Sequence, residues 1–339
     1  MLAITQLKQY QGEYEGGKWY SENLEELPAE ISEDSILWVD AEDPTEDEMA
    51  QLRRNFGLVN LDLELLSEEG KRSKIEEHEE WVSCFVRFPS RDHYMVDGKA
   101  DWLAIEAGKK RILSIHRGRS SITCEIYKKI STHGYFALSL SPSTDILLYI
   151  FLDLITNECF YVSDLVHERL QSLSQVAAGR FRQRTRNLDR KLGLDITAAR
   201  DQALGLRQSI GPLREVVGRV ARGEFAIVAS KLLPRFEDLY DRTISLIEVV
   251  DTHREEIHDI GDVLINVQTL TTNNIIRVLT IISAIFLPLT LIAGIYGTNF
   301  TRGFFEPGSN SIYGFYGMIT AMAIVAAMLI LIFKRKGWI

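Results

Sequence analysis

Two long uncharged runs near the carboxyl end constrain the fold of this 339-residue chain more than any other feature. Residues 278–296 (VLTIISAIFLPLTLIAGIY) and 312–333 (IYGFYGMITAMAIVAAMLILIF) contain no Asp, Glu, Lys or Arg. About twenty apolar residues in a helix cross the hydrocarbon core of a bilayer, which is roughly 30 Å thick. The alternative is a buried hairpin in a soluble protein, but two such runs followed by a basic tail favour two membrane spans, over about 275–296 and 312–333.

Basic residues flank the two runs on one side of the membrane. Arg277 precedes the first run and Lys-Arg-Lys at 334–336 follows the second, whereas the connecting segment 297–311 carries one arginine and one glutamate. Because positive charge concentrates on the cytoplasmic side, we expect 297–311 to be an extracytoplasmic loop and 334–339 a cytoplasmic tail. The chain is then an integral protein of the cell membrane, plasma or inner, with both termini in the cytoplasm.

The part before the first span has the pattern of an α/β domain followed by helices. Alternating apolar and polar residues in SILWVDAEDP, EEWVSCFVRFP and ADWLAIEAGKKRILSIH predict strands. Thr45 and Glu48 have the spacing of a helix capping box. Strand signals become rare after about residue 140, so we predict an α/β domain over 1–140 and a helical segment over 141–234.

Composition limits the functions of this cytoplasmic part. Its first fifty residues hold fourteen Asp and Glu against Lys8 and Lys18, which argues against binding nucleic acid. The cysteines Cys84, Cys124 and Cys159 form no CxxC pair, so we expect reduced, buried thiols. No catalytic motif is recognisable, and we expect neither an enzyme nor a bound cofactor.

A single very long helix is predicted over residues 235–296, leading from the cytoplasmic part into the first span. Apolar or small residues recur at intervals of three and four from Phe236 to Val267, which marks one face of a helix. At 1.5 Å per residue this helix is on the order of 90 Å long. Its apolar face calls for neighbouring helices or for parallel copies of the chain in an oligomer.

The first span has a stripe of small and polar residues opposite bulky ones such as Ile282 and Phe286. The stripe runs through Asn273, Ile276, Thr280, Ser283, Leu287, Thr290 and Gly294. Such a stripe lines either a water-filled path or a tight contact between helices, and the residues alone leave both readings open. Two spans cannot enclose a path by themselves, so a pore requires a ring of subunits.

Four segments together resemble the CorA family of divalent cation channels. They are TNNIIRVLTIISAIFLPLTLIAGIYGTNF (272–300), FKRKGWI (333–339), FEDLYDRTISLIE (236–248) and, more weakly, WVDAEDPTEDEM (38–49). The resemblance implies a funnel-shaped homopentamer in which the first span lines the pore and the second lies outside it. It also implies a divalent cation as the transported ion and as a regulatory ligand.

The resemblance assigns roles to particular residues. Gly297, Thr298 and Asn299 match the Gly-Met-Asn signature, with Asn299 as the outer selectivity ring. The implied pore-lining residues are polar Asn273 and Thr290 and the apolar constrictions Ile276, Leu279 and Leu287, together with Thr280, Ser283 and Gly294 of the stripe. Asp238, with Asp241 nearby, matches an acid that binds a regulatory metal between subunits, but its partner acid is not identified.

Thr298 departs from the signature, in which a methionine occupies this position. The ZntB-like branch of the family also varies there, so the transported ion is Mg²⁺, Co²⁺ or Ni²⁺ in one reading and Zn²⁺ in the other. A membrane-anchored cation sensor that conducts nothing is a third alternative. Glu255 and His258 have the spacing of a helical metal motif, but no second such motif accompanies them, and we expect a solvated helix face.

Overall fold

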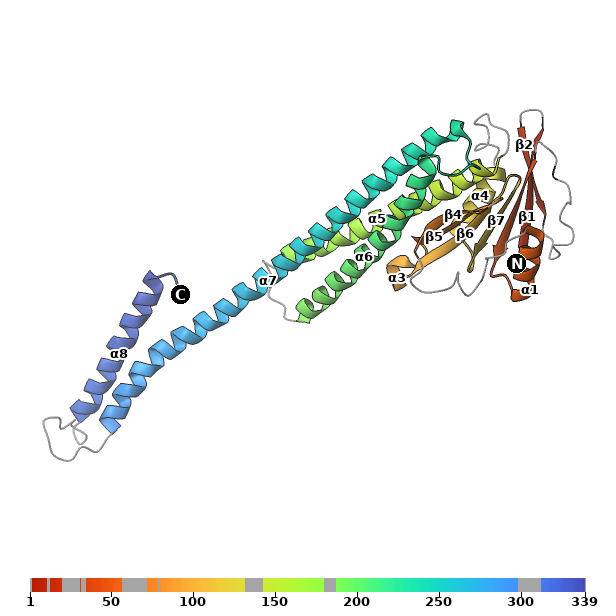
Figure 1. Ribbon diagram of the computed structural model, residues 1–339. Helices are drawn as coiled ribbons and strands as arrows, with labels where there is room; N and C mark the ends of the chain where they lie inside the picture. The colour runs from red at the N-terminus through yellow and green to blue at the C-terminus, as the bar shows by residue number, and fades with distance from the viewer. Residues whose placement is uncertain are drawn as a thin grey trace. The chain divides into compact units, whose positions relative to one another are not determined.

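The computed structural model describes residues 2–10, 13–19, 31, 35–56, 72–78, 80–131, 143–179, 187–297 and 312–338 (Figure 1). The chain divides into two compact units, Met1–Gly261 (unit 1) and Asp262–Ile339 (unit 2). One helix, α7, crosses the boundary between them. Unit 1 contains a sheet covered by helices, whereas the described part of unit 2 is helical.

Unit 1 contains a seven-stranded mixed sheet in the order β2-β1-β3-β7-β6-β5-β4. The central pair β3 and β7 is parallel, and the remaining neighbours are antiparallel. The strands are β1 (Leu2–Tyr10), β2 (Glu13–Trp19), β3 (Ser35–Glu42), β4 (Lys74–Glu77), β5 (Val82–Pro89), β6 (Ala100–Ala107) and β7 (Arg111–His116).

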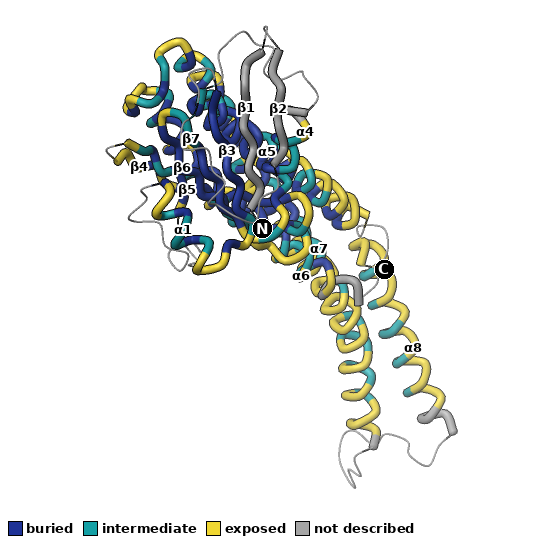
Figure 2. The backbone as a smooth tube through the Cα atoms, turned by 90° about the vertical axis from the view of Figure 1, so that its right-hand side faces the viewer, coloured by how far each residue is buried: buried dark blue, intermediate teal, exposed yellow. Residues whose placement is uncertain are grey.

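Helices cover both faces of this sheet, because the central strands alternate apolar residues to either side. Leu37 and Val39 of β3 pack with Met49 and Leu52 of α1 (Glu46–Phe56). Ile36 and Trp38 of the same strand belong to the larger core, which contains the long helices. Figure 2 shows the central strands as almost wholly buried. Strand β3 therefore lies in the interior of unit 1.

The start of α1 confirms the predicted capping box. The Thr45 backbone amide donates to the Glu48 carboxylate at 2.8 Å, and the Glu48 amide donates to Thr45 Oγ1 at 3.3 Å. This reciprocal pair satisfies backbone donors that a helix leaves free at its first turn. The segment after β3 thus turns directly into the helix that covers one face of the sheet.

The remaining helices follow the sheet strands or lie beyond them. A short helix α3 (Tyr94–Asp97) lies between β5 and β6, and α4 (Ser121–Ser131) follows β7. The others are α5 (Thr144–Gly179), α6 (Asn187–Ala221), a short 3₁₀ turn η2 (Ser230–Leu232), α7 (Leu233–Gly297) and α8 (Ile312–Arg335).

The first third of α7 packs within unit 1. Phe236, Leu239, Leu246 and Val250 join α5 and α6 in the large core, and burial along α7 continues to Ile260. These intervals of three, four and seven place the residues on one helix face. Neighbouring helices of the same chain therefore cover the apolar face that the sequence predicted for this stretch. An α/β part, a very long helix and two apolar helices near the carboxyl end confirm the predicted fold class.

Candidate functional site

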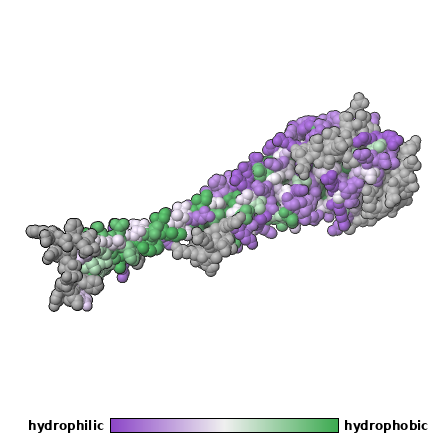
Figure 3. Space-filling view, turned by 90° about the horizontal axis from the view of Figure 1, so that it is seen from below, coloured by the Kyte–Doolittle hydropathy of each residue, from purple (hydrophilic) through white to green (hydrophobic). Residues whose placement is uncertain are grey.

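Three described helices are long and apolar enough to cross a membrane, but they differ in how far the protein covers them. The most apolar window of α5 is 72% buried within the structure, whereas that of α7 is 0% buried and that of α8 is 6% buried. Exposed side chains there include Leu279, Phe286, Leu287, Ile324 and Leu331, each more than 60% exposed. Figure 3 shows apolar surface gathered on this part of the chain. Apolar surface of this extent suits lipid rather than water.

The predicted stripe lies on the least covered side of α7. All of its members are exposed: Asn273, Ile276, Thr280, Ser283, Leu287, Thr290 and Gly294. The bulky side chains of Leu279, Ile282 and Phe286 are exposed as well. The half-buried side chains of the same stretch are Asn274, Ile281, Ala284, Ile285, Pro288, Leu289 and Ile292. At about 100° per residue, the centres of the stripe and of the half-buried set lie roughly 140° apart around the helix. The small and polar face is therefore left open by the residues that the structure describes.

Two threonines on the stripe hold their hydroxyl hydrogens within the helix. Thr280 Oγ1 donates to the Ile276 carbonyl and Thr290 Oγ1 donates to the Phe286 carbonyl, each at 2.8 Å. A hydroxyl has one hydrogen and two lone pairs, so each oxygen retains acceptor capacity toward its surroundings. This geometry gives the exposed face hydrogen-bond acceptors without adding charge.

The signature lies at the carboxyl end of α7. Gly297 is the last residue of this helix, while Thr298 and Asn299 lie outside the described residues. Their roles therefore stay predictions. At the other end of α7, Asp238 and Asp241 are both exposed on the part of the helix that belongs to unit 1. Two exposed acids three residues apart on a helix suit a contact with another molecule. Among the described residues, the partner acid of the predicted regulatory metal site is not identified.

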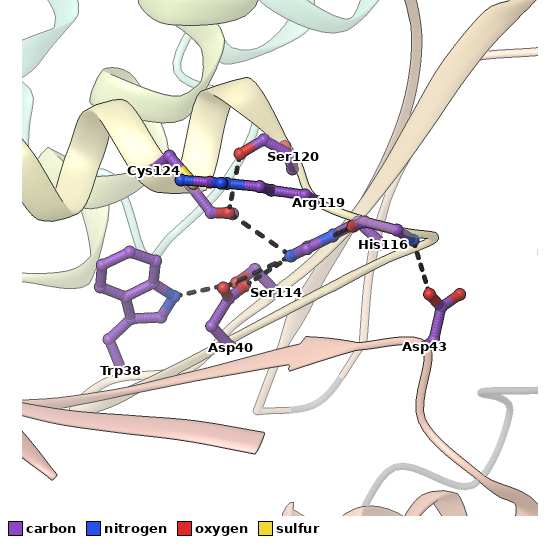
Figure 4. A network of polar contacts seen from close by, with 10 residues as sticks. Trp38, Asp40, Asp43, Ser114, His116, Arg119, Ser120 and Cys124 are labelled. Atoms are coloured by element: carbon purple, nitrogen blue, oxygen red, sulfur yellow. Dashed lines mark hydrogen bonds and ion pairs between the residues drawn. The ribbon is translucent and has the colours of Figure 1, made fainter. Parts of the chain in front are cut away.

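A buried polar network in unit 1 was not predicted (Figure 4). Trp38 Nε1 donates to Ser114 Oγ at 2.9 Å, and Ser114 Oγ donates in turn to the Asp40 carboxylate. The Asp40 carboxylate also lies 3.3 Å from His116 Nε2. Burial alone would lower the pKa of His116, but the hydrogen bond to Asp40 and its charge outweigh burial and raise that pKa.

Although this network contains Ser, His and Asp, its geometry is structural. His116 Nε2 faces Asp40 and Thr123, and Nδ1 contacts the Gly118 carbonyl at 2.6 Å. Both ring nitrogens are thus occupied, and the Ser114 hydrogen goes to the carboxylate instead of to the imidazole, unlike a nucleophilic triad. The network ties β3 to β7 and to the start of α4.

The cysteines agree with the prediction of free thiols. All three are unpaired; Cys84 and Cys159 are buried, whereas Cys124 is half-buried. Burial raises the pKa of the Cys84 and Cys159 thiols well above its usual range, so neither is a thiolate at neutral pH. These two side chains contribute to the core as small apolar groups.

Unit 1 packs its sheet and helices around a common core, and α7 joins it to apolar helix segments that stay exposed. This arrangement defines a class of membrane protein with a large part outside the membrane. The model of the family described as CorA-like Mg2+ transporter protein matches residues 33–335, so the chain belongs to the CorA family. It is a divalent cation transporter of that family. Members of this family are transporters, which confirms that the chain is not an enzyme.

Individual relatives are similar over most of the chain. The cobalt/magnesium transport protein CorA of Thermotoga maritima is 27% identical over 288 residues, 84% of this chain and 78% of the relative. Its namesake in Methanocaldococcus jannaschii is 25% identical over 304 residues, 90% of this chain and 92% of that protein. The complete structure of the M. jannaschii CorA magnesium transporter superposes with a TM-score of 0.81 at 24% identity, covering 99% and 98% of the two chains, and this shows the shared fold.

Proposed function

We propose that this chain moves Mg²⁺, with Co²⁺ and Ni²⁺ as further substrates, through a path lined by the exposed stripe of α7. The observation that carries the proposal is that every residue of this stripe is exposed, on the side of the helix away from its half-buried residues. One chain cannot enclose a path with one stripe, so several copies surround a common axis. The family resemblance puts their number at five.

The chemistry of the stripe suits a hydrated dication. Mg²⁺ releases its water ligands reluctantly, and its hydration shell presents hydrogens to the surroundings. Thr280 and Thr290 offer acceptor lone pairs, because their own hydrogens are bonded within the helix. Asn273 and Asn299 add amide oxygens at the two ends of the span. Rings of Ile276 and Leu287 form apolar constrictions at which the path closes by excluding water.

The orientation follows from the distribution of charge. Arg277 precedes the first span and the basic residues 334–336 follow the second, whereas the segment between the spans carries little charge. Both termini and the whole of unit 1 then face the cytoplasm. Asp238 and Asp241 on α7 are the regulatory metal ligands of this arrangement, exposed for a neighbouring copy.

The test is uptake of divalent cations into proteoliposomes that contain the purified protein. We expect Mg²⁺ entry with the native sequence and its loss with Asn299→Ala. Thr290→Val removes one acceptor oxygen from each subunit and should slow entry at least about fivefold, since a single hydrogen bond contributes about 1 kcal/mol. Thr320→Val on α8 is the matched control, because Thr320 is also exposed and donates to the Tyr316 carbonyl at 2.8 Å.

Other outcomes would redirect the proposal. Entry of Zn²⁺ without Mg²⁺, especially if a proton gradient accelerates it, would identify Thr298 as part of a zinc-selective signature. If Thr290→Val and Thr320→Val slow entry equally, the transport path does not run along the α7 stripe. Absence of entry for every ion would support a membrane-anchored cation sensor.

A further inference from the structure

Two histidines and a glutamate from different helices meet inside unit 1. His167 lies on α5, and His253 and Glu256 lie one turn apart on α7, so residues 86 positions apart in sequence become neighbours. One ligand atom from each of the three side chains lies within 4.8 Å of the other two. The imidazole rings are stacked with centroids 5.4 Å apart, and His167 Nδ1 is 3.7 Å from the Glu256 carboxylate.

The buried histidine has a nitrogen that the protein does not use. His253 is only 4% exposed, and its Nδ1 has no hydrogen-bond partner among the described residues. His167 Nδ1 is likewise buried and lacks a hydrogen bond in the part of the chain that the structure describes. Leaving a buried polar atom unsatisfied costs free energy, so two such nitrogens in a cluster that also contains a carboxylate call for a ligand.

Other groups on α5 hold the two rings in place. His253 Nε2 lies 3.1 Å from Ser163 Oγ, and His167 Nε2 lies 2.9 Å from the Gln171 side-chain amide. Ser163, His167 and Gln171 are spaced by four residues and therefore share one face of α5. A hydrogen bond to the far ring nitrogen is the usual way in which a protein orients a metal-binding imidazole. When the side-chain oxygen of Gln171 faces His167 Nε2, that nitrogen carries the ring hydrogen. His167 Nδ1 then keeps a free lone pair.

The charge balance also favours a cation. A neutral imidazole is the form that binds metals. Glu256 supplies one negative charge at the site, and the exposed Asp164 on α5 adds to the negative field around His253.

We propose that His167, His253 and Glu256 form a binding site for a transition-metal dication of the Zn²⁺, Co²⁺ or Ni²⁺ class, which links α5 to α7. Two imidazoles and one carboxylate favour these ions over Mg²⁺, which prefers oxygen ligands alone. In a tetrahedral site with bonds of roughly 2.1 Å the ligand atoms are about 3.4 Å apart, so small rotamer changes close the cluster around an ion. Water completes the coordination on the exposed side of His167 and Glu256. The site is separate from the α7 stripe and from Asp238 and Asp241.

The experiment uses the full-length, tag-free protein in detergent after treatment with a chelator. Co²⁺ is titrated while the visible spectrum is recorded, because Co²⁺ in a low-coordinate nitrogen–oxygen site absorbs far more strongly than the hydrated ion. The melting temperature is measured in parallel with Zn²⁺, Co²⁺ and Mg²⁺ at equal concentrations. We expect a visible band that saturates at one ion per chain, and a higher melting temperature with Zn²⁺ and Co²⁺.

The variants separate this site from any other metal site. His167→Ala and Glu256→Gln alter half-exposed side chains, so the fold survives, and each should weaken Co²⁺ binding by at least about tenfold. His258→Ala, an exposed histidine on the same helix, should leave binding unchanged. Absence of the band, or a band that persists in both His167→Ala and Glu256→Gln, overturns the proposal. A Mg²⁺ stabilisation that disappears in His167→Ala overturns the assigned class of ion.

Discussion

Helix α5 and the apolar segments of α7 and α8 share length and apolar character but have opposite surroundings. All three satisfy the same criterion of length and apolar composition for a membrane span. The protein covers α5 with the sheet and with α6, whereas it leaves α7 and α8 exposed in unit 2. The most apolar window of α5 has a mean hydropathy of 1.5, against 2.5 for α7 and 2.4 for α8. A threshold of length and hydropathy therefore admits a core helix together with the exposed ones.

The difference lies in the acids that each helix carries. Asp153 and Glu158 of α5 are buried, and each is paired with an arginine from another element. Arg242 donates to Asp153 at 2.6 Å, and Arg91 binds Glu158 through two guanidinium nitrogens. The runs 278–296 and 312–333 contain no ionisable acid or base of this kind. A helix inside a protein can bury a charge because a partner is available, whereas lipid provides none.

The largest effect is expected from a charge placed in the exposed apolar surface of unit 2. Ile324, near the middle of α8, is 63% exposed, and Ile324→Lys should cost about 2.5–3.5 kcal/mol of membrane insertion. The matched control is Val176→Lys on α5, where an apolar side chain is 44% exposed within unit 1. There we expect a change within about 0.5 kcal/mol, because that surface faces water.

Recovery of each variant in the membrane fraction measures this contrast. Strong loss for Ile324→Lys together with normal recovery for Val176→Lys assigns lipid to one surface and water to the other. Equal recovery of the two variants would contradict the comparison.

An intermediate effect is expected when a buried acid of α5 loses its partner. The Glu158 side chain is 1% exposed and bound by Arg91, which also lies 4.5 Å above the Tyr161 ring. Arg91→Ala should cost about 3 kcal/mol, since a buried carboxylate is left without its counter-ion. Thermal melting of the purified full-length protein measures this as a fall of roughly 6–12 °C.

The exposed pair of Lys74 and Glu76 provides the control for that variant. Their side chains are 48% and 49% exposed and 2.8 Å apart. Lys74→Ala should cost at most about 1 kcal/mol, because solvent screens such a pair. If both variants lower the melting temperature equally, burial does not decide the strength of these pairs.

An effect of similar or smaller size, which depends on pH, is expected at Glu106, a buried acid for which the described residues offer no basic partner. Burial is the main cause that raises the pKa of Glu106 from 4.5 to about 7, while a hydrogen bond from Ser83 opposes the shift. The folded state therefore binds a proton that the unfolded state has released between these pH values. Stability falls as pH rises from about 4.5 to 7, and the full cost of the buried charge remains above pH 7.

Glu106→Gln removes this charge and keeps an oxygen that accepts from Ser83. The variant should be more stable than the native protein by up to about 3 kcal/mol at pH 8, and the gain should vanish near pH 4. Melting curves at the two pH values test this expectation. A gain of the same size at both would show that ionisation of Glu106 is not its cause.

The sequence predicted those parts of the molecule whose signals are local. The capping box at Thr45, the strands around Trp38 and Leu103, and the long helix all depend on patterns within a few turns of chain. The two spans were recognisable because lipid requires about twenty uncharged residues in succession. The small and polar stripe was likewise readable, since helix periodicity alone places its members on one face.

The features that the sequence did not reveal depend on contacts between distant elements. Strands β1 and β2 at the amino terminus complete the sheet, yet their segment gave no strand prediction. Glu255 and His258 had a metal-like spacing, whereas the structure gathers the neighbouring Glu256 and His253 with His167 of α5. No spacing rule encodes the packing of α5 against α7. The signature residues Thr298 and Asn299 lie beyond the described end of α7, so their prediction rests on the family.

The continuity of α7 has a mechanical consequence. It is the one element that crosses from unit 1 into unit 2, and it does so without an interruption between Leu233 and Gly297. Its backbone hydrogen-bond ladder therefore joins the packed residues up to Ile260 to the stripe that begins at Asn273. We expect a rotation of α7 among its neighbours in unit 1 to be transmitted along this ladder, so that the start of the stripe rotates with it.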